Sequence, residues 1–197
     1  MSARRRSRRR LTPRRLLGLV VVLVAGAVLV AFPRLLGDGS AGVDPGGAGA
    51  VPVPTSVPAA AAEAVVERVV DGDTVIVTVS GERERVRLIG VDTPETVKPD
   101  APIDCFGPEA SAFTTATLPE GATVWLEDDA SQGDSDRYDR LLRYVWSPDG
   151  TMLNERLVAE GYGREDTYDD AYRYRDRFVA AEASAEASRV GLWAACG

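Results

Sequence analysis

Residues 69–95 read VVDGDTVIVTVSGERERVRLIGVDTPE, and this stretch contains two of the strands that decide the fold. Alternating valines in residues 75–79 lead into a turn at Ser80-Gly81, and residues 85–91 continue as the next strand. Residues 65–70 alternate in the same way just before this stretch. The pattern therefore predicts three linked antiparallel strands.

The rest of the chain predicts two more strands and three helices. The strands are expected at residues 124–127 and 141–146, and five short strands in a turn-rich chain suit a small closed barrel. Helices are expected at residues 108–117, 153–160 and 169–189, with Pro108 at a first helical position and Gly161 and Gly191 at helix ends. The predicted fold class is α+β, a β-barrel with three helices.

The same opening stretch brings together groups that suit phosphodiester cleavage. Asp73 and Asp92 offer hard carboxylate oxygens for a divalent cation, Arg87 offers a planar fork for phosphate, and Glu95 offers a base. The chain has no histidine, which excludes an imidazole base and leaves proton transfer to carboxylates. With only two cysteines as well, the chain lacks the usual ligands of a zinc site.

The amino-terminal end predicts export. Eight arginines lie between residues 4 and 15, and the apolar run at residues 16–32 forms a helix of about 25 Å, close to bilayer thickness. The arginines favour the cytoplasmic side, which puts everything after Arg34 outside the cytoplasm, anchored in the membrane. A cleaved signal peptide is the alternative, with Ala48-Gly49-Ala50 as the cleavage site and a secreted product.

Composition divides the chain into three parts. Residues 1–36 are the basic segment and anchor, and residues 37–62 are a flexible linker because residues 37–58 hold six glycines and four prolines. Residues 63–197 have the length of one domain with one core, and we expect a monomer.

Cys105 and Cys196 both lie in the exported part, where no reducing environment keeps them as thiols. We predict a disulfide between them, which would remove chain entropy worth about 4 to 5 kcal/mol from the unfolded state. The alternative is a pair of free buried cysteines.

Charge is distributed unevenly along the chain. The net charge is −7, but residues 1–36 hold nine arginines and no acid, so the remainder has 14 basic and 30 acidic residues and a charge of −16. An acidic domain repels polyanions at long range, although salt screens distant charges within about 10 Å at 0.1 M. We therefore expect binding to nucleic acid to depend on a bound cation.

The chain resembles the staphylococcal nuclease (thermonuclease) family through motifs in the family's order. They are DGDT at residues 71–74, RLIGVDTPE at 87–95, GPEASAF at 107–113, DRYDR at 136–140, LNERLVAEG at 153–161 and GLW at 191–193. The resemblance implies a five-stranded OB-fold barrel with three helices. It also implies a calcium-dependent endonuclease that acts on DNA and RNA.

Matching the motifs position by position implies individual roles. Asp73 and Asp92 correspond to the family's calcium-binding carboxylates, and Thr93 would supply its backbone carbonyl. Glu95 would hold the attacking water, either as its general base or as an orienting group.

The resemblance also implies a phosphate grip. Arg87 and Arg140 match the two arginines that hold the scissile phosphate, and Tyr138 matches a tyrosine beside it. The family usually has glycine where this chain has Asp139. Tyr162 and Tyr168 lie in the region of the family's nucleotide-stacking tyrosines.

Each feature also has an explanation without catalysis. DGDT is commonly just a turn, and Arg140 could form an exposed ion pair with Asp136 or Asp139. The alternative for the whole domain is a non-catalytic OB-fold module that binds nucleic acid or a protein. The shortage of basic residues argues against strand binding without a metal.

Overall fold

The computed structural model describes residues 56–96, 102–168 and 170–196. The predicted anchor at residues 16–32, the alternative cleavage site and most of the linker lie outside the described residues. Within the described part of the chain, no helix is long and apolar enough to cross a membrane.

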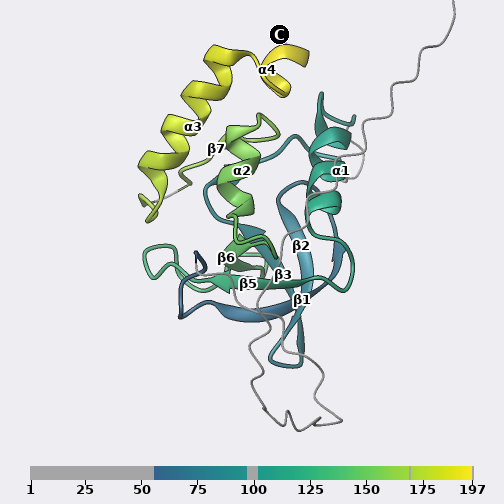
Figure 1. Cartoon of the computed structure of the whole chain (residues 1–197), viewed down its shortest axis with the longest axis vertical. Helices are drawn as coiled ribbons and strands as arrows, with labels where there is room; N and C mark the ends of the chain where they lie inside the picture. Colours follow the sequence, from purple (N-terminus) through teal and green to yellow (C-terminus); the bar gives the residue numbers. More distant parts are fainter. Residues whose placement is uncertain (1–55, 97–101, 169, 197) are drawn as a thin grey trace, which may run out of the picture. The chain divides into compact units, whose positions relative to one another are not determined.

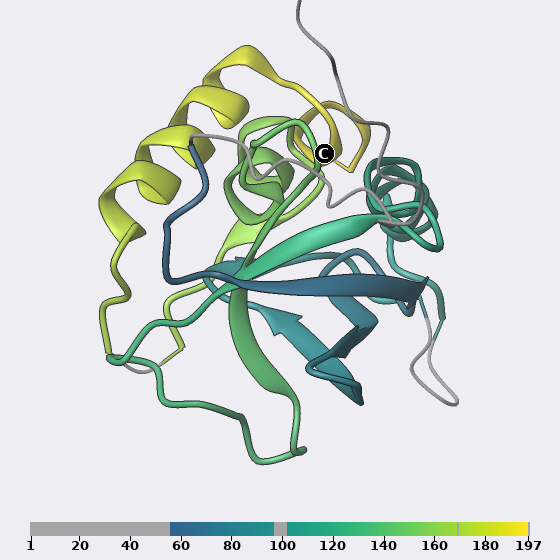
Figure 2. The ribbon, with the colours of Figure 1, turned by 60° about the horizontal axis from the view of Figure 1, so that its bottom comes forward.

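The core of the fold is a closed barrel of five strands in the order β1-β2-β3-β6-β5 (Figures 1 and 2). The pair β3 and β6 is parallel, and the other pairs are antiparallel. The strands are β1 (Ala62–Val69), β2 (Thr74–Val79), β3 (Glu82–Leu88), β5 (Thr123–Glu127) and β6 (Leu141–Trp146). The predicted five-stranded barrel is confirmed.

Branched and aromatic side chains fill the barrel. Val75, Val77 and Val86 are fully buried, and Leu88 and Trp125 are 1% exposed. β-Branched residues favour the pleated backbone, and burying one such side chain stabilises the fold by about 1.5 to 3 kcal/mol.

The three predicted helices lie together on one side of the barrel (Figures 1 and 2). They are α1 (Gly107–Thr117), α2 (Leu153–Ala159) and α3 (Arg175–Ser188). Helix α2 packs against both β6 and α3, and its Leu153, Leu157 and Val158 are completely buried. A short fourth helix, α4 (Leu192–Ala195), was not predicted.

The third strand was predicted three residues too far along the chain, at residues 85–91, whereas β3 covers Glu82–Leu88. β3 ends at Leu88, the chain turns at Gly90 with a φ of 76°, and Val91–Asp92 forms a separate strand, β4. A Cβ at Gly90 would lie 2.5 Å from the Tyr172 ring, so the close packing of that ring requires glycine. Strand β4 leaves the barrel and pairs with β7 (Arg164–Glu165).

The last helix begins six residues later than predicted because the segment before it is bonded to the barrel. The buried Asp129 carboxylate accepts hydrogen bonds from the Tyr144 hydroxyl and the Arg173 backbone N–H, both 2.8 Å long. The Tyr172 hydroxyl is also in hydrogen-bond reach of the Gly90 carbonyl, at 3.3 Å. These contacts hold residues 172–174 outside the helix, so α3 begins only at Arg175.

Cys105 and Cys196 are joined by a disulfide. Cys105 precedes α1, and Cys196 follows α4. The bond therefore ties the last residues of the domain to the segment that enters the first helix.

Candidate active site

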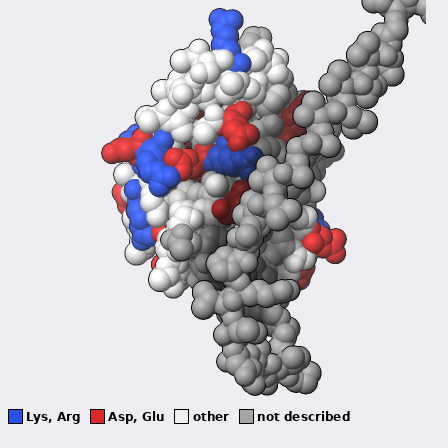
Figure 3. All heavy atoms as spheres, viewed as in Figure 1, with Lys and Arg blue, Asp and Glu red and all other residues white. Residues whose placement is uncertain are grey.

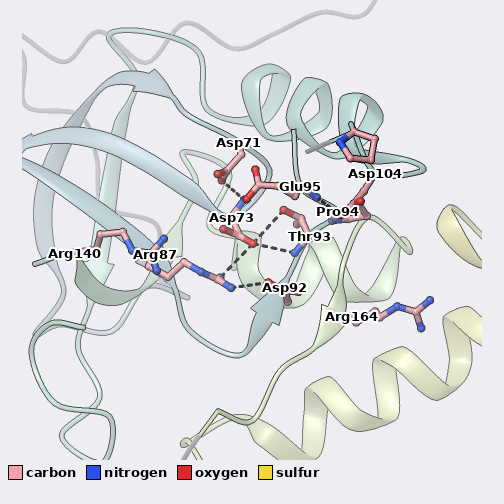
Figure 4. A pocket seen from close by; sticks show the side chains of 11 residues that line it. Asp71, Asp73, Arg87, Asp92, Thr93, Pro94, Glu95, Asp104, Arg140 and Arg164 are labelled. Atoms are coloured by element: carbon pink, nitrogen blue, oxygen red, sulfur yellow. Dashed lines mark hydrogen bonds and ion pairs between the residues drawn. The ribbon is translucent and has the colours of Figure 1, made fainter. Parts of the chain in front are cut away.

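Six of the predicted site residues line one cavity of about 560 Å³ (Figure 4). They are Asp73, Arg87, Asp92, Thr93, Glu95 and Arg140. Tyr138 is not among the residues that line it and is 58% exposed. The cavity is also lined by Asp71, Pro94, Pro102, Asp104 and Arg164.

Strand register brings the distant parts of the site together. Thr74 on β2 lies opposite Arg87 on β3, and Val86 on β3 lies opposite Leu141 on β6. Asp73 and Arg140 each come one residue before a paired residue. The ends of three neighbouring strands therefore place two guanidinium groups and a carboxylate at the same edge of the barrel.

The Asp73 side chain joins the DGDT turn to the VDTPE segment. Its carboxylate is buried, and Oδ2 accepts hydrogen bonds from the Thr93 backbone N–H at 2.9 Å and hydroxyl at 3.1 Å. Gly72 allows this approach, since a Cβ there would lie 2.6 Å from Thr93 Oγ1. From helix α1, the Thr114 hydroxyl donates to the Gly72 carbonyl at 2.7 Å and holds the turn in place.

Arg87 is held by hydrogen-bond acceptors of the protein itself. Its Nη1 donates to the Val91 carbonyl at 2.5 Å and lies 3.3 Å from Asp73 Oδ2, while Nη2 donates to Asp92 Oδ1 at 3.0 Å. The side chain is only 14% exposed. These contacts preorganise the guanidinium fork beside the carboxylates (Figure 4).

Glu95 is held through its backbone by Asp104. The Glu95 N–H donates to Asp104 Oδ2 at 3.1 Å, and the Asp104 N–H donates back to the Glu95 carbonyl at 3.0 Å. The Glu95 carboxylate accepts a hydrogen bond from the Thr96 N–H at 2.8 Å. This reciprocal pair fixes the backbone from which the Glu95 side chain enters the cavity.

Arg140 follows a tight turn that Asp136 organises. The Asp136 carboxylate accepts from Arg140 Nε at 2.7 Å and from the Tyr138 and Arg140 backbone N–H groups. Burial raises the pKa of Asp136, but these bonds outweigh it and leave the pKa below its ordinary value. The Tyr138 ring lies 5.4 Å from the Arg140 guanidinium carbon, within cation–π range.

Asp139 adopts a left-handed backbone conformation with a φ of 56°. Glycine adopts this conformation without a steric penalty, and aspartate tolerates it better than most residues. A glycine, which the resemblance implies at this position, would therefore fit the same turn, and Asp139 is compatible with its backbone conformation.

The acidic side chains of the cavity repel one another. Burial, followed by the charge of Asp73, raises the pKa of Asp71 from 3.8 to about 6. Burial and the same charge raise the pKa of Asp92, although Arg87 opposes the shift. A bound cation would relieve this repulsion.

The donors in the cavity fit a hard cation. They are carboxylate and carbonyl oxygens, which suit calcium or magnesium better than softer metals. Among the described residues, no three acidic side chains gather closely enough to hold a metal by themselves. A cation here would therefore need backbone carbonyl or water ligands in addition to Asp73 and Asp92.

Sequence reasoning missed three charged residues of the cavity. Asp71 lies two positions before Asp73 in the same motif, so its proximity could have been anticipated. The positions of Asp104 and Arg164 could not have been anticipated. Asp104 contacts the backbone of Glu95, and Arg164 is placed by the short pairing of β7 with β4.

Comparison with known proteins shows the family to which this chain is similar. The model of the family described as "Staphylococcal nuclease homologue" matches residues 85–195. The chain belongs to this family. The match includes Arg87, Asp92, Thr93, Glu95 and Arg140 and begins after Asp73.

Individual relatives agree with this membership. The chain is 44% identical to the thermonuclease of Staphylococcus hyicus over 126 residues, which is 64% of this chain and 72% of that protein. It is 43% identical to the thermonuclease of Staphylococcus intermedius over 129 residues, 66% of this chain and 74% of that protein. Endonuclease YncB of Bacillus subtilis is 35% identical over 133 residues, 66% of this chain and 61% of that protein.

The raised pKa of Asp71 predicts that Asp71→Asn stabilises the metal-free protein at alkaline pH. The folded state is favoured when the Asp71 carboxyl is neutral. The stability that this carboxyl contributes is therefore fully present below pH 3.8 and is lost as pH rises through about 6. After allowance for solvent screening, we expect the free energy of unfolding to rise by about 1 to 2 kcal/mol at pH 8 in chelator. Urea unfolding at pH 8 and pH 4.5 measures this difference.

The increase in the free energy of unfolding caused by Asp71→Asn should be smaller at pH 4.5 than at pH 8. As a control, Asp128→Asn at an exposed position should leave the free energy of unfolding nearly unchanged at either pH. A loss of stability in Asp71→Asn at pH 8 would mean that the hydrogen bond from the Asp73 N–H outweighs the repulsion.

Proposed function

We propose that this chain is a calcium-dependent endonuclease that hydrolyses phosphodiester bonds in DNA and RNA. Family membership and the thermonuclease and endonuclease relatives support a nuclease. The observation that carries the proposal is the shared cavity, in which two guanidinium forks face carboxylates that have raised pKa values.

In the proposed reaction, the arginines stabilise the negative charge that develops on the phosphate oxygens. Attack by water adds negative charge to the equatorial oxygens, and Arg87 and Arg140 stabilise it most strongly where water is excluded. Glu95 either takes a proton from the attacking water or orients it. The bond from phosphorus to the leaving oxygen then breaks, and that oxygen takes a proton from water.

Asp73, Asp92 and the Thr93 carbonyl are the proposed calcium ligands. Calcium accepts six to eight oxygens in flexible geometry, so this set leaves positions for water and a phosphate oxygen. When bound, the ion supplies Lewis-acid stabilisation of the phosphate charge. The Thr93 backbone has a fixed position relative to Asp73 because its N–H donates to that carboxylate at 2.9 Å.

Recognition through phosphate supports activity on both DNA and RNA. The charged residues of the cavity suit a phosphate and a cation, and such contacts carry no sequence information. The protein, which we propose to be a monomer, therefore needs only an accessible strand of either nucleic acid as its substrate.

Substitution of the proposed catalytic groups tests the roles directly. We expect Arg87→Ala and Glu95→Ala each to lower the rate of cleavage by about 10²- to 10³-fold, because each removes a preorganised charged group. Initial rates on plasmid DNA and on RNA measure the effect, with circular dichroism as a check of the fold.

Arg83→Ala is the matched control, since Arg83 lies on the same strand but is exposed and pairs with Glu67 outside the cavity. Wild-type turnover in either site variant would refute the assignment.

Metal removal tests the cofactor. We expect plasmid cleavage with calcium and none with excess chelator, with activity restored when calcium is added back. Cleavage that persists in chelator would contradict the metal role. Binding to DNA with no cleavage under any condition would favour the non-catalytic OB-fold module instead.

We also propose an extracytoplasmic location, with attachment to the membrane through residues 16–32. The Cys105–Cys196 disulfide supports an oxidising compartment. Mass spectrometry of the protein recovered from the producing cells tests this proposal. A full-length membrane fraction is expected for the anchor, a shortened form in the medium indicates cleavage, and reduced protein in the cytoplasm would contradict export.

A further inference from the structure

Arg164 is the third arginine of the cavity, and the proposed catalytic roles do not use it. It lies on β7 directly opposite Asp92 on β4. Residues paired in this way have Cα atoms roughly 4.5 to 5.5 Å apart. The register therefore places an arginine backbone beside a proposed calcium ligand.

Arg164 differs from the other two arginines in its charge balance. Arg87 pairs with Asp73 and Asp92, and Arg140 pairs with Asp136. Arg164 is exposed and forms no ion pair with any described residue. On the face shown in Figure 3, most basic side chains lie beside acidic ones. An arginine that forms no ion pair with a described residue is therefore unusual in this acidic domain.

Trp193 holds the Arg164 guanidinium. The guanidinium carbon lies 4.2 Å from the centroid of the Trp193 ring. Stacking on a ring uses the flat face of a guanidinium and leaves the N–H edge free, and that edge matches two phosphate oxygens. The contact therefore preorganises a phosphate donor.

Two links fix the position of Trp193, the ring on which Arg164 packs. The N–H of Leu192, next to Trp193, donates to the Gly161 carbonyl at 2.8 Å. Cys196, which follows this helix, is bonded to Cys105, and Cys105 adjoins the Asp104 that holds the Glu95 backbone. Through these links, Arg164 has a fixed position relative to the proposed base.

We propose that Arg164 binds a phosphate of the substrate strand that flanks the scissile phosphate. In Figure 4, Arg164 lies on the opposite side of Asp92 from Arg87 and Arg140, and its guanidinium points away from the carboxylates. It is thus placed for a neighbouring phosphate and not for the reacting one. The inference rests on the proposed nuclease function and implies a preference for oligonucleotides over single diesters.

Kinetics on two substrates test the subsite. We expect Arg164→Gln to raise KM for a short oligonucleotide about tenfold with little change in kcat, since it removes one phosphate contact. For bis(p-nitrophenyl) phosphate, which has no flanking phosphate, kcat/KM should fall by no more than about twofold. Arg164→Lys should lie between wild type and Arg164→Gln because it keeps the charge but not the fork.

The matched control is Arg68→Gln, which removes the same charge from an exposed position on β1 outside the cavity. It should leave both substrates unaffected. Equal losses on both substrates for Arg164→Gln, or a lower Tm with an unchanged KM, would overturn the subsite and leave Arg164 as a packing partner of Trp193.

A binding measurement separates this inference from the nuclease proposal. In a Glu95→Gln background with calcium, fluorescence anisotropy of a labelled oligonucleotide should show about tenfold weaker binding for Arg164→Gln, with a salt slope smaller by about one. If wild type cleaves nothing but this difference holds, the subsite stands and the nuclease proposal fails. If Arg164→Gln binds like Arg68→Gln, the subsite is wrong whatever the catalysis.

Discussion

The arrangement of the site depends on the buried carboxylate of Asp73. Its hydrogen bonds to Thr93 join two turns that lie twenty residues apart, one at the start of β2 and one after β4. A buried carboxylate needs such partners, because an unpaired one would be strongly destabilising. The same requirement that keeps Asp73 satisfied therefore brings Asp92, Thr93 and Glu95 to the edge of the barrel.

This arrangement leaves the cavity with an excess of acid over accessible base. Arg87 and Arg140 are both paired with carboxylates, so a phosphate must compete with those carboxylates for the two forks. A cation bound by Asp73 and Asp92 would weaken the ion pairs that these two carboxylates form with Arg87 and so make its guanidinium available to phosphate. The net charge of −16 outside the first 36 residues thus fits a site that binds its polyanion only after a cation.

Sequence patterns predicted the parts of the molecule that local physics determines. Alternating valines located β2 because the side-chain period of a strand is visible over a few residues, and Pro108 located the start of α1. They failed where a distant contact decides the backbone. The end of β3 depends on Tyr172 packing over Gly90, and the start of α3 depends on the bond from Arg173 to Asp129.

The site divides in the same way. The motif that contains Asp73, Arg87, Asp92 and Glu95 could be recognised directly in one stretch of sequence. Arg164 is placed by the pairing of β4 and β7, and strands of two residues are too short for a periodic pattern to predict. Its guanidinium packs on Trp193, and three residues further along the chain a disulfide joins Cys196 to Cys105, 91 positions away. The barrel edge thus fixes the groups placed for the reacting phosphate. The carboxyl-terminal helix α4 and the disulfide that follows it support Arg164, which is placed to bind the strand beyond that phosphate.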